Sequence, residues 1–262
     1  MKYGFIGCGN MGGALAKALA KTTKDILLAD FDANKAKALA EELAVSVGTN
    51  EEVVSACEMI FLGVKPQVME TVLAPLKGIF ADKKPLVITM AAGIKTEKIE
   101  EFCGAKLPVI RIMPNTPVSV GKGMVLYCTN ELVSDEMVNE FLNDMRFAGE
   151  FDRLPEDLID AGCSVSGCGP AFMYMFIDAL AEGGVKCGLS REQAVKYAAV
   201  TMLGAAELAM KSGKEPEQLR REVCSPGCST IEGVKVFENS GLQEIGVKAV
   251  EASFKRNKEL GN

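Results

Sequence analysis

Three closely spaced glycines near the start of the chain could let its backbone approach a bound phosphate group. Gly7, Gly9 and Gly12 follow an apolar run and precede a helical pattern, the context that a G-x-G-x-x-G motif requires. The first glycine permits a tight turn, the second lets a pyrophosphate approach, and the third allows close packing of helix on strand. The alternative is a tight turn that binds nothing. We predict dinucleotide contacts from Gly7, Cys8, Gly9, Asn10, Met11 and Gly12.

Two aspartates follow the next apolar run, where a dinucleotide places its adenosine ribose. Asp30 and Asp32 flank Phe31, and no arginine stands beside them. A carboxylate here accepts hydrogen bonds from ribose hydroxyls and favours NAD(H), whereas an arginine would favour NADP(H). Lys35 lies one helical turn further on. The sequence therefore predicts an NAD(P)H site with Asp30 on the ribose and leans toward NADH, although either aspartate could instead cap the following helix.

Three later segments also follow apolar runs, and ligands of open α/β sheets bind beyond the carboxyl ends of the strands. Small residues at 91–93 would let a flat ring lie against the backbone, and two prolines fix the direction of Asn115. For Lys65 alone, a solvated surface lysine is the commoner explanation. The cofactor contacts predicted here are Val64, Lys65, Pro66, Ala91, Ala92, Gly93 and Asn115.

Two polar, turn-prone stretches interrupt the apolar last third of the chain. One spans residues 164–170, and the other runs from Ser225 to Thr230 and ends where a helical pattern begins. Backbone N–H groups at a helix start can bind a carboxylate. Simple N-capping by serine or threonine is the alternative. We predict substrate contacts from Ser225, Gly227, Cys228, Ser229 and Thr230.

These residues need a scaffold, and the chain's periodicity predicts one. Up to about Pro155, short apolar runs alternate with helical patterns, which is typical of a doubly wound parallel sheet of the Rossmann class. Beyond it only long helical patterns remain, notably 171–185 and the alanine-rich 191–211. We predict a dinucleotide-binding domain at 1–155 and an all-α domain at 156–262. Its helices form either an ordinary core or, as we favour, a subunit interface, which implies at least a homodimer.

Composition excludes several other classes of protein. The net charge is −6 without a basic cluster, which argues against nucleic acid and against a membrane surface. The longest uncharged run, 161–177, is too short and too broken to span a bilayer. The nine cysteines have no C-x-x-C spacing and the chain has no histidine, so we expect reduced thiols, a cytoplasmic protein and no metal site. The first residues already read as a core strand, so we expect no signal peptide.

Taken in order, the motifs resemble those of the pyrroline-5-carboxylate reductase family. The resemblance spans the chain: the glycine turn, Val64-Lys65-Pro66, 91–93, 113–117, 166–172, 178–185, and Ser225-Pro226-Gly227 with Thr230. It implies hydride transfer from NAD(P)H to a cyclic imine acid to make proline, and Thr230 placed against the imine nitrogen. It also implies a ring of dimers as one possible assembly.

Two cysteines depart from that pattern. Cys228 stands where the family usually has glycine, and Cys168 where serine is usual. If position 228 requires a positive φ, a residue other than glycine costs roughly 1 kcal/mol there. Both substitutions concern substrate contacts and not the class of reaction.

Two rival functions share this architecture. A reductase of β-hydroxy acids or ketopantoate would use a lysine of the helical domain as acid, and Lys186, Lys196 and Lys211 stand in no such motif. A nucleotide-sensing regulatory protein would not need the full set of strand-end motifs and a carboxylate loop. The absence of histidine fits imine reduction, because a cyclic imine is readily protonated and its reduction depends on positioning more than on a strong acid.

Overall fold

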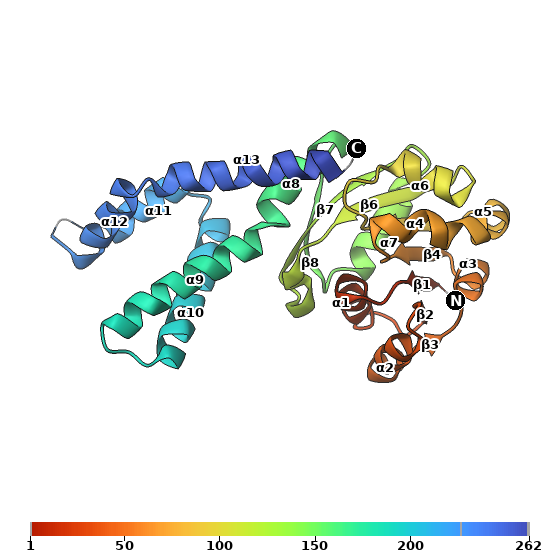
Figure 1. The fold of residues 1–262 in the computed structure, drawn as a ribbon, viewed down its shortest axis with the longest axis horizontal. Coiled ribbons are helices and arrows are strands. Elements are labelled where there is room, and N and C mark those ends of the chain that lie inside the picture. The colour runs from red at the N-terminus through yellow and green to blue at the C-terminus, as the bar shows by residue number, and fades with distance from the viewer. Residues whose placement is uncertain (1, 226, 261–262) are drawn as a thin grey trace. The chain divides into compact units, whose positions relative to one another are not determined.

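The computed structural model describes residues 2–225 and 227–260, drawn in Figure 1. The chain forms two compact units. One comprises Met1–Cys168 with Ser253–Asn262, and the other comprises Gly169–Ala252. Each unit is described by itself below.

The first unit is built on an eight-stranded sheet with the order β3-β2-β1-β4-β5-β6-β7-β8 (Figure 1). Strands β3 to β6 are parallel, β7 is antiparallel to β6, and β8 is parallel to β7. This order confirms the predicted doubly wound Rossmann sheet. The strands are β1 (Tyr3–Ile6), β2 (Ile26–Ala29), β3 (Ser46–Val47), β4 (Met59–Leu62), β5 (Leu86–Thr89), β6 (Val109–Met113), β7 (Gly123–Thr129) and β8 (Gly149–Arg153).

Helices cover both faces of this sheet, which explains why its central strands are apolar on both sides. Successive residues of β1 point to opposite faces: Phe5 joins the core with Leu15, whereas Ile6 joins the core with Val53. The helices are α1 (Asn10–Leu19), α2 (Ala33–Leu43), α3 (Asn50–Ala56), α4 (Pro66–Leu73), α5 (Lys77–Lys83), α6 (Thr96–Cys103), α7 (Asp135–Asp144) and α8 (Ile159–Ser166). Short 3₁₀ turns occur at η1 (Ala74–Leu76), η2 (Thr116–Val120) and η3 (Glu156–Leu158).

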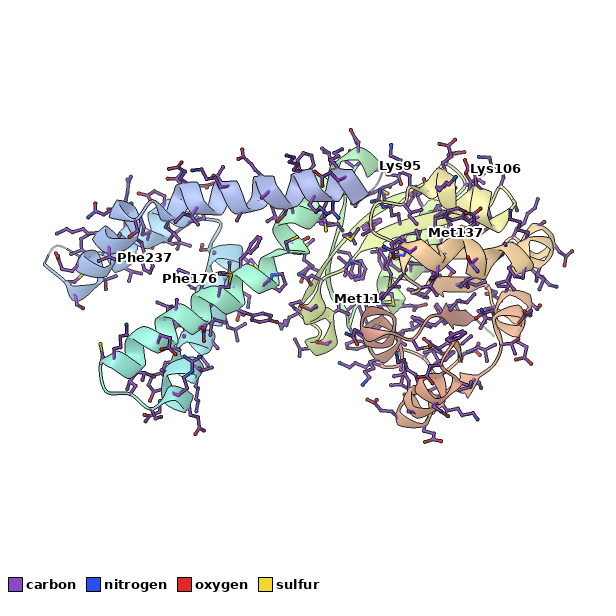
Figure 2. All side chains as sticks on the ribbon, in the orientation of Figure 1. Met11, Lys95, Lys106, Met137, Phe176 and Phe237 are labelled. Carbon is purple, nitrogen blue, oxygen red and sulfur yellow. The ribbon has the colours of Figure 1, made fainter. Side chains whose placement is uncertain are left out.

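The second unit is entirely helical in its described residues. Its helices are α9 (Gly169–Lys186), α10 (Arg191–Ser212), α11 (Pro216–Val223), α12 (Ser229–Asn239) and most of α13 (Leu242–Leu260). Phe176 of α9 and Phe237 of α12 point toward each other, with ring centroids 5.5 Å apart (Figure 2).

This second unit buries few side chains of its own. Among its described residues only Ala181, Ala194 and Ala198 are buried, whereas apolar side chains such as Met175 (73% exposed) and Val200 (60%) face outward. An apolar surface of this extent is typical of a subunit interface.

The first unit extends beyond the predicted boundary at residue 155. Ile159 of α8 shares a core cluster with Met113 and Leu126 of the sheet. Asn257, near the end of α13, donates hydrogen bonds to the Asp160 carbonyl and the Ser164 hydroxyl, each at 3.2 Å. The change in hydrophobic period near residue 155 therefore marks the end of the last strand, β8. It does not mark the end of the first unit, because α8 still packs on the sheet.

One helical stretch, Glu156–Lys186, has the length and the mean hydropathy (1.2) of a membrane span. This is weak evidence for a membrane span, because core helices of soluble proteins have the same length and hydropathy. The stretch comprises η3, α8 and α9, so its helical part is longer than the uncharged run 161–177 suggested. Only 6% of its apolar window is buried within the chain. Association of subunits would remove such a surface from water.

Candidate active site

The glycine turn after β1 is closely packed. Gly7 has φ +99°, and a Cβ there would lie 2.7 Å from the carbonyl carbon of Gly63. A Cβ at Gly12 or at Gly63 would overlap the Gly7 carbonyl oxygen. Gly7 and Gly12 thus have the roles expected of them, the tight turn and the close approach of helix to strand. Gly63, at the end of β4, completes this contact and was not among the predicted site residues.

Gly9 differs from its neighbours because it faces open space. A Cβ there would have no heavy atom within 4 Å, and its φ of −65° is ordinary. Gly9 is the N-cap of α1, and no side chain caps that helix. The first N–H groups of α1 are therefore available to an anion. The geometry fits a pyrophosphate.

Asp30 and Asp32 have different structural roles. Asp32 caps α2, accepting from the N–H groups of Asn34 (3.1 Å) and Lys35 (3.4 Å). Asp30 accepts the Cys8 N–H at 2.6 Å with one oxygen and the Asp32 N–H at 2.9 Å with the other. A carboxylate offers about four lone pairs. Asp30 therefore keeps acceptor capacity for a ribose hydroxyl directly beside the glycine turn.

A cleft of about 400 Å³ opens next to this turn. It is lined by Cys8, Gly9 and Asn10 and also by Lys35 of α2. Burial raises the pKa of the Cys8 thiol to about 12, and the nearby Asp30 carboxylate adds to the shift. The cysteine in the turn is therefore neutral at physiological pH, and Lys35 brings a positive charge to the cleft.

The other strand-end segments lie at the same edge of the sheet. Lys65 is exposed and precedes Pro66, the first residue of α4. Ala91 is buried, and Gly93 has φ +75°. A pocket of about 10 Å³ joins Ala92 and Gly93 to residues of β6, α8 and the end of α13.

Both polar atoms of the Asn115 side-chain amide are hydrogen-bonded. Its Nδ2 donates to the Ser166 carbonyl at 2.9 Å, and its Oδ1 accepts the Met124 N–H at 2.9 Å. The side chain is nearly buried, with 8% exposed. Asn115 thus ties the loop after β6 to β7 and to the end of α8, and one N–H of its amide remains for a ligand.

A buried arginine lies behind this edge, and the sequence-based prediction missed it. Arg111 on β6 is 1% exposed, and its guanidinium meets Asp160 at 3.2 Å and Glu156 at 3.5 Å. Glu156 in turn accepts the Thr96 N–H at 2.8 Å. A charged residue inside the apolar run 109–112 was the available signal, because buried charges are normally paired.

The loop before α12 carries the five predicted substrate residues. Gly227 has φ +77° and needs glycine, whereas Cys228 is extended at φ −81° and does not. The cysteine at position 228 therefore imposes no backbone strain. Ser225, Ser229 and Thr230 are exposed, and Pro226 lies outside the described residues.

Cys228 rather than Thr230 is the N-cap of α12. Hydrogen bonding from the Ile231 N–H, and secondarily from the Thr230 hydroxyl, lowers the pKa of the Cys228 thiol. The Cys228 thiol thus stands at the start of α12, beside its first N–H groups. No side chain makes a conventional capping bond to this helix, so Thr230 does not serve as its cap.

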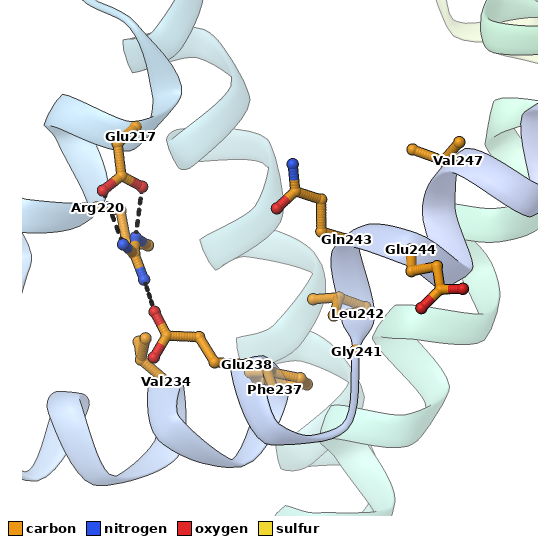
Figure 3. Close-up of a pocket in the computed structure, with 10 residues that line it drawn as sticks. All are labelled: Glu217, Arg220, Val234, Phe237, Glu238, Gly241, Leu242, Gln243, Glu244 and Val247. Atoms are coloured by element: carbon orange, nitrogen blue, oxygen red, sulfur yellow. Dashed lines mark hydrogen bonds and ion pairs between the residues drawn. The ribbon is translucent and has the colours of Figure 1, made fainter.

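A cavity of about 800 Å³ lies in the second unit, among α11, α12 and α13 (Figure 3). Arg220 bridges Glu217 and Glu238 on one side, and Phe237, Leu242 and Val247 give apolar walls. None of the predicted site residues lines it. Among described residues the structure shows no cluster of metal-ligating side chains, and all nine cysteines are free.

Comparison with known proteins identifies the family. The protein-family model described as pyrroline-5-carboxylate reductase dimerisation matches residues 156–260. A second family model, described as NADP oxidoreductase coenzyme F420-dependent, matches residues 2–93. The pyrroline-5-carboxylate reductase of Synechocystis sp. is 37% identical over 266 residues, covering 100% of this chain and 98% of that protein. This chain belongs to the pyrroline-5-carboxylate reductase family. It is an NAD(P)H-dependent oxidoreductase of proline biosynthesis.

Solved structures of pyrroline-5-carboxylate reductases agree with this assignment. The Coxiella burnetii enzyme superposes with a TM-score of 0.92 at 33% identity and covers 100% of this chain and 98% of its own. The Plasmodium falciparum enzyme, solved with NADP bound, has a TM-score of 0.87 at 31% identity, with 100% and 98% covered. The helical domain of this reductase is thus a dimerisation domain, and the enzyme is a homo-oligomer.

Proposed function

We propose that this reductase binds NAD(P)H along the carboxyl edge of its sheet and binds pyrroline-5-carboxylate at the loop 225–230. The start of α1 beside the open Gly9 carries the cofactor part of this proposal, because its first N–H groups have no side-chain partner and the space at Gly9 leaves room for a phosphate. When bound, NAD(P)H supplies the hydride. The residues of the chain bind and orient the two reactants.

The contacts follow the order of the strands. Gly7–Gly12 receive the pyrophosphate, and Asp30 accepts the ribose hydroxyls with its remaining lone pairs. Residues 64–66 and 91–93 border the nicotinamide half. Asn115 contributes one amide N–H and mainly positions the loop after β6.

NADH should bind at least as well as NADPH. The Asp30 carboxylate accepts the Cys8 N–H at 2.6 Å and so lies beside the glycine turn. A 2′-phosphate on the ribose of NADPH would meet its like charge there. Lys35 borders the same cleft and is the cation that could offset this repulsion. Steady-state kcat/KM with both cofactors tests the preference. A strong preference for NADPH would contradict it, and loss of that preference in Lys35→Met would identify Lys35 as the cation that offsets the repulsion.

The loop before α12 suits a small cyclic imino acid. The N–H groups at the start of α12, beside the Cys228 sulfur, bind the carboxylate, and the Thr230 hydroxyl hydrogen-bonds to the ring nitrogen. Hydride adds to the carbon of the C=N bond, and the nitrogen keeps the proton that it carries as an iminium. Hydride transfer requires near contact between the hydride donor and the carbon of the C=N bond.

A panel of substrates tests the activity. NADH oxidation is followed with pyrroline-5-carboxylate, pyrroline-2-carboxylate and ketopantoate under identical conditions. We expect turnover with the first and little with the others, because the loop must place a carboxylate and a ring nitrogen together. Turnover with ketopantoate alone would contradict the proposed substrate site.

We further propose a cytoplasmic homodimer or a larger ring of dimers. The exposed apolar helices support the association. Burial raises the pKa of the Cys57 thiol to about 11 and of the Cys103 thiol to about 12, and no cysteine is paired, which suits a reducing compartment.

A further inference from the structure

Phe31 is the most exposed large hydrophobic side chain of the described structure, at 108%. A single exposed apolar residue is ordinary on a protein surface. Its position is not ordinary, because Phe31 follows β2 at the edge of the sheet where the cofactor is proposed to bind.

The register of the strands places Phe31 beside the glycine turn. Strand β1 lies between β2 and β4, with Ile6 paired to Ala29 on one side and to Leu62 on the other. The segments after β2 and β4 therefore flank residues 7–9. The Cys8–Asp30 hydrogen bond of 2.6 Å confirms the approach on one side, and the close packing of Gly7 on Gly63 confirms it on the other.

The backbone that carries the Phe31 ring is held on both sides. Asp30 uses its two oxygens on the N–H groups of Cys8 and Asp32, and Asp32 caps α2 through Asn34 and Lys35. The ring itself is uncovered. A held backbone that presents a free aromatic face suits a planar ligand, because stacking then costs no further backbone entropy.

The neighbours of the ring define the ligand. Asp30 and Asp32 flank it, so the surface lacks the contiguous apolar area of a protein-docking site and disfavours an anionic group over the ring. A neutral aromatic base next to a ribose held by Asp30 satisfies both conditions. We infer that Phe31 stacks on the adenine of NAD(P)H and sets the affinity for its adenosine half. This inference rests on the proposed cofactor site.

Calorimetric titration with ADP-ribose, which carries the adenine but no nicotinamide, tests the inference without turnover. Stacking of a base on an aromatic side chain predicts that Phe31→Ala raises the Kd by about tenfold. Phe31→Tyr should retain the wild-type Kd. Leu132→Ala, an exposed apolar loop residue at the opposite edge of the sheet, should leave it unchanged.

A second measurement separates adenine binding from other effects. Reduced nicotinamide mononucleotide lacks adenine, so its KM as hydride donor should be equal for the wild type and Phe31→Ala. An unchanged Kd for ADP-ribose, or an equal loss with the mononucleotide, would overturn the inference.

Gly9→Asn tests the cofactor site independently of Phe31, because an asparagine cap would occupy the N–H groups at the start of α1. If Gly9→Asn weakens ADP-ribose binding and Phe31→Ala does not, only the stacking fails. If neither does, the cofactor site fails with it.

Discussion

Two glycines of the first turn are constrained for different reasons, and substitutions should separate them. Gly12→Ala puts a methyl group against the Gly7 carbonyl, so we expect a loss of about 1–3 kcal/mol in unfolding free energy. At Gly9 a Cβ would meet no atom and an asparagine improves the cap of α1, so Gly9→Asn should keep the stability while the Kd for NADH rises at least about tenfold. Denaturant unfolding and NADH titration measure the two effects. Equal stability losses would contradict this division.

If the loop before α12 binds the substrate as proposed, Cys228 should make that binding sensitive to pH. Its thiol pKa is lowered from 9.0, first by the Ile231 N–H, so the thiolate forms at a lower pH than that of an ordinary cysteine. A thiolate over the carboxylate site should raise the substrate KM as pH rises, by about fivefold for one charge contact of about 1 kcal/mol in water.

Cys228→Gly should abolish this alkaline rise in KM and lower the KM at all pH values, because it frees the amides of α12. Cys187→Ser, at an exposed cysteine of the same unit, is the matched control and should keep the wild-type profile. A Cys228→Gly profile that still follows the wild type would exclude the thiol as the cause.

At the residue scale, the sequence predicted those roles that depend on neighbours along the chain. The tight turn at Gly7 was predicted, and capping of the next helix was the alternative offered for Asp32; both follow from local rules. The bonds of Asn115 could not be predicted, because its Nδ2 meets a carbonyl 51 positions away. The extended backbone of Cys228 also required the structure, since a glycine-rich loop leaves its φ open.

Among the elements, the Arg111 cluster joins β6, η3 and α8 to the start of α6. Arg111→Met leaves Glu156 and Asp160 without their buried cation, and removing one partner of a buried ion pair costs about 3–5 kcal/mol. Arg153→Met, at an exposed arginine that contacts Thr129, should cost less than about 1 kcal/mol. Denaturant unfolding at equal protein concentration gives both values, and a loss below 1 kcal/mol at Arg111 would show that the cluster is not stabilising.

The elements themselves were largely predictable for one physical reason. Strands β1, β2, β4 and β5 are buried along their whole length, so each appears as an uninterrupted apolar run. The short helices α5 and α6, of 7 and 8 residues, were not predicted. The extent of the first unit depends on how α8 packs on β7, which periodicity does not encode.

For the whole molecule, the dimerisation domain should keep the enzyme from existing as a stable monomer. Val200 on α10 is 60% exposed within one chain, and an apolar side chain so placed is expected to lie between subunits. Val200→Glu should therefore shift the mass measured by light scattering toward the monomer and lower the Tm. Leu132→Glu, in a loop of the first unit, should change neither. A wild type that is monomeric and active at low concentration would contradict the prediction.

The most direct test of the account is the turnover of Thr230 variants. Thr230 is exposed and does not cap α12, so its removal should leave the fold intact. If its hydroxyl hydrogen-bonds to the ring nitrogen, Thr230→Ala lowers kcat/KM for pyrroline-5-carboxylate by about 10²-fold, while the Kd for NADH stays unchanged and Thr230→Ser retains most of the activity. A fully active Thr230→Ala would contradict the proposed substrate site.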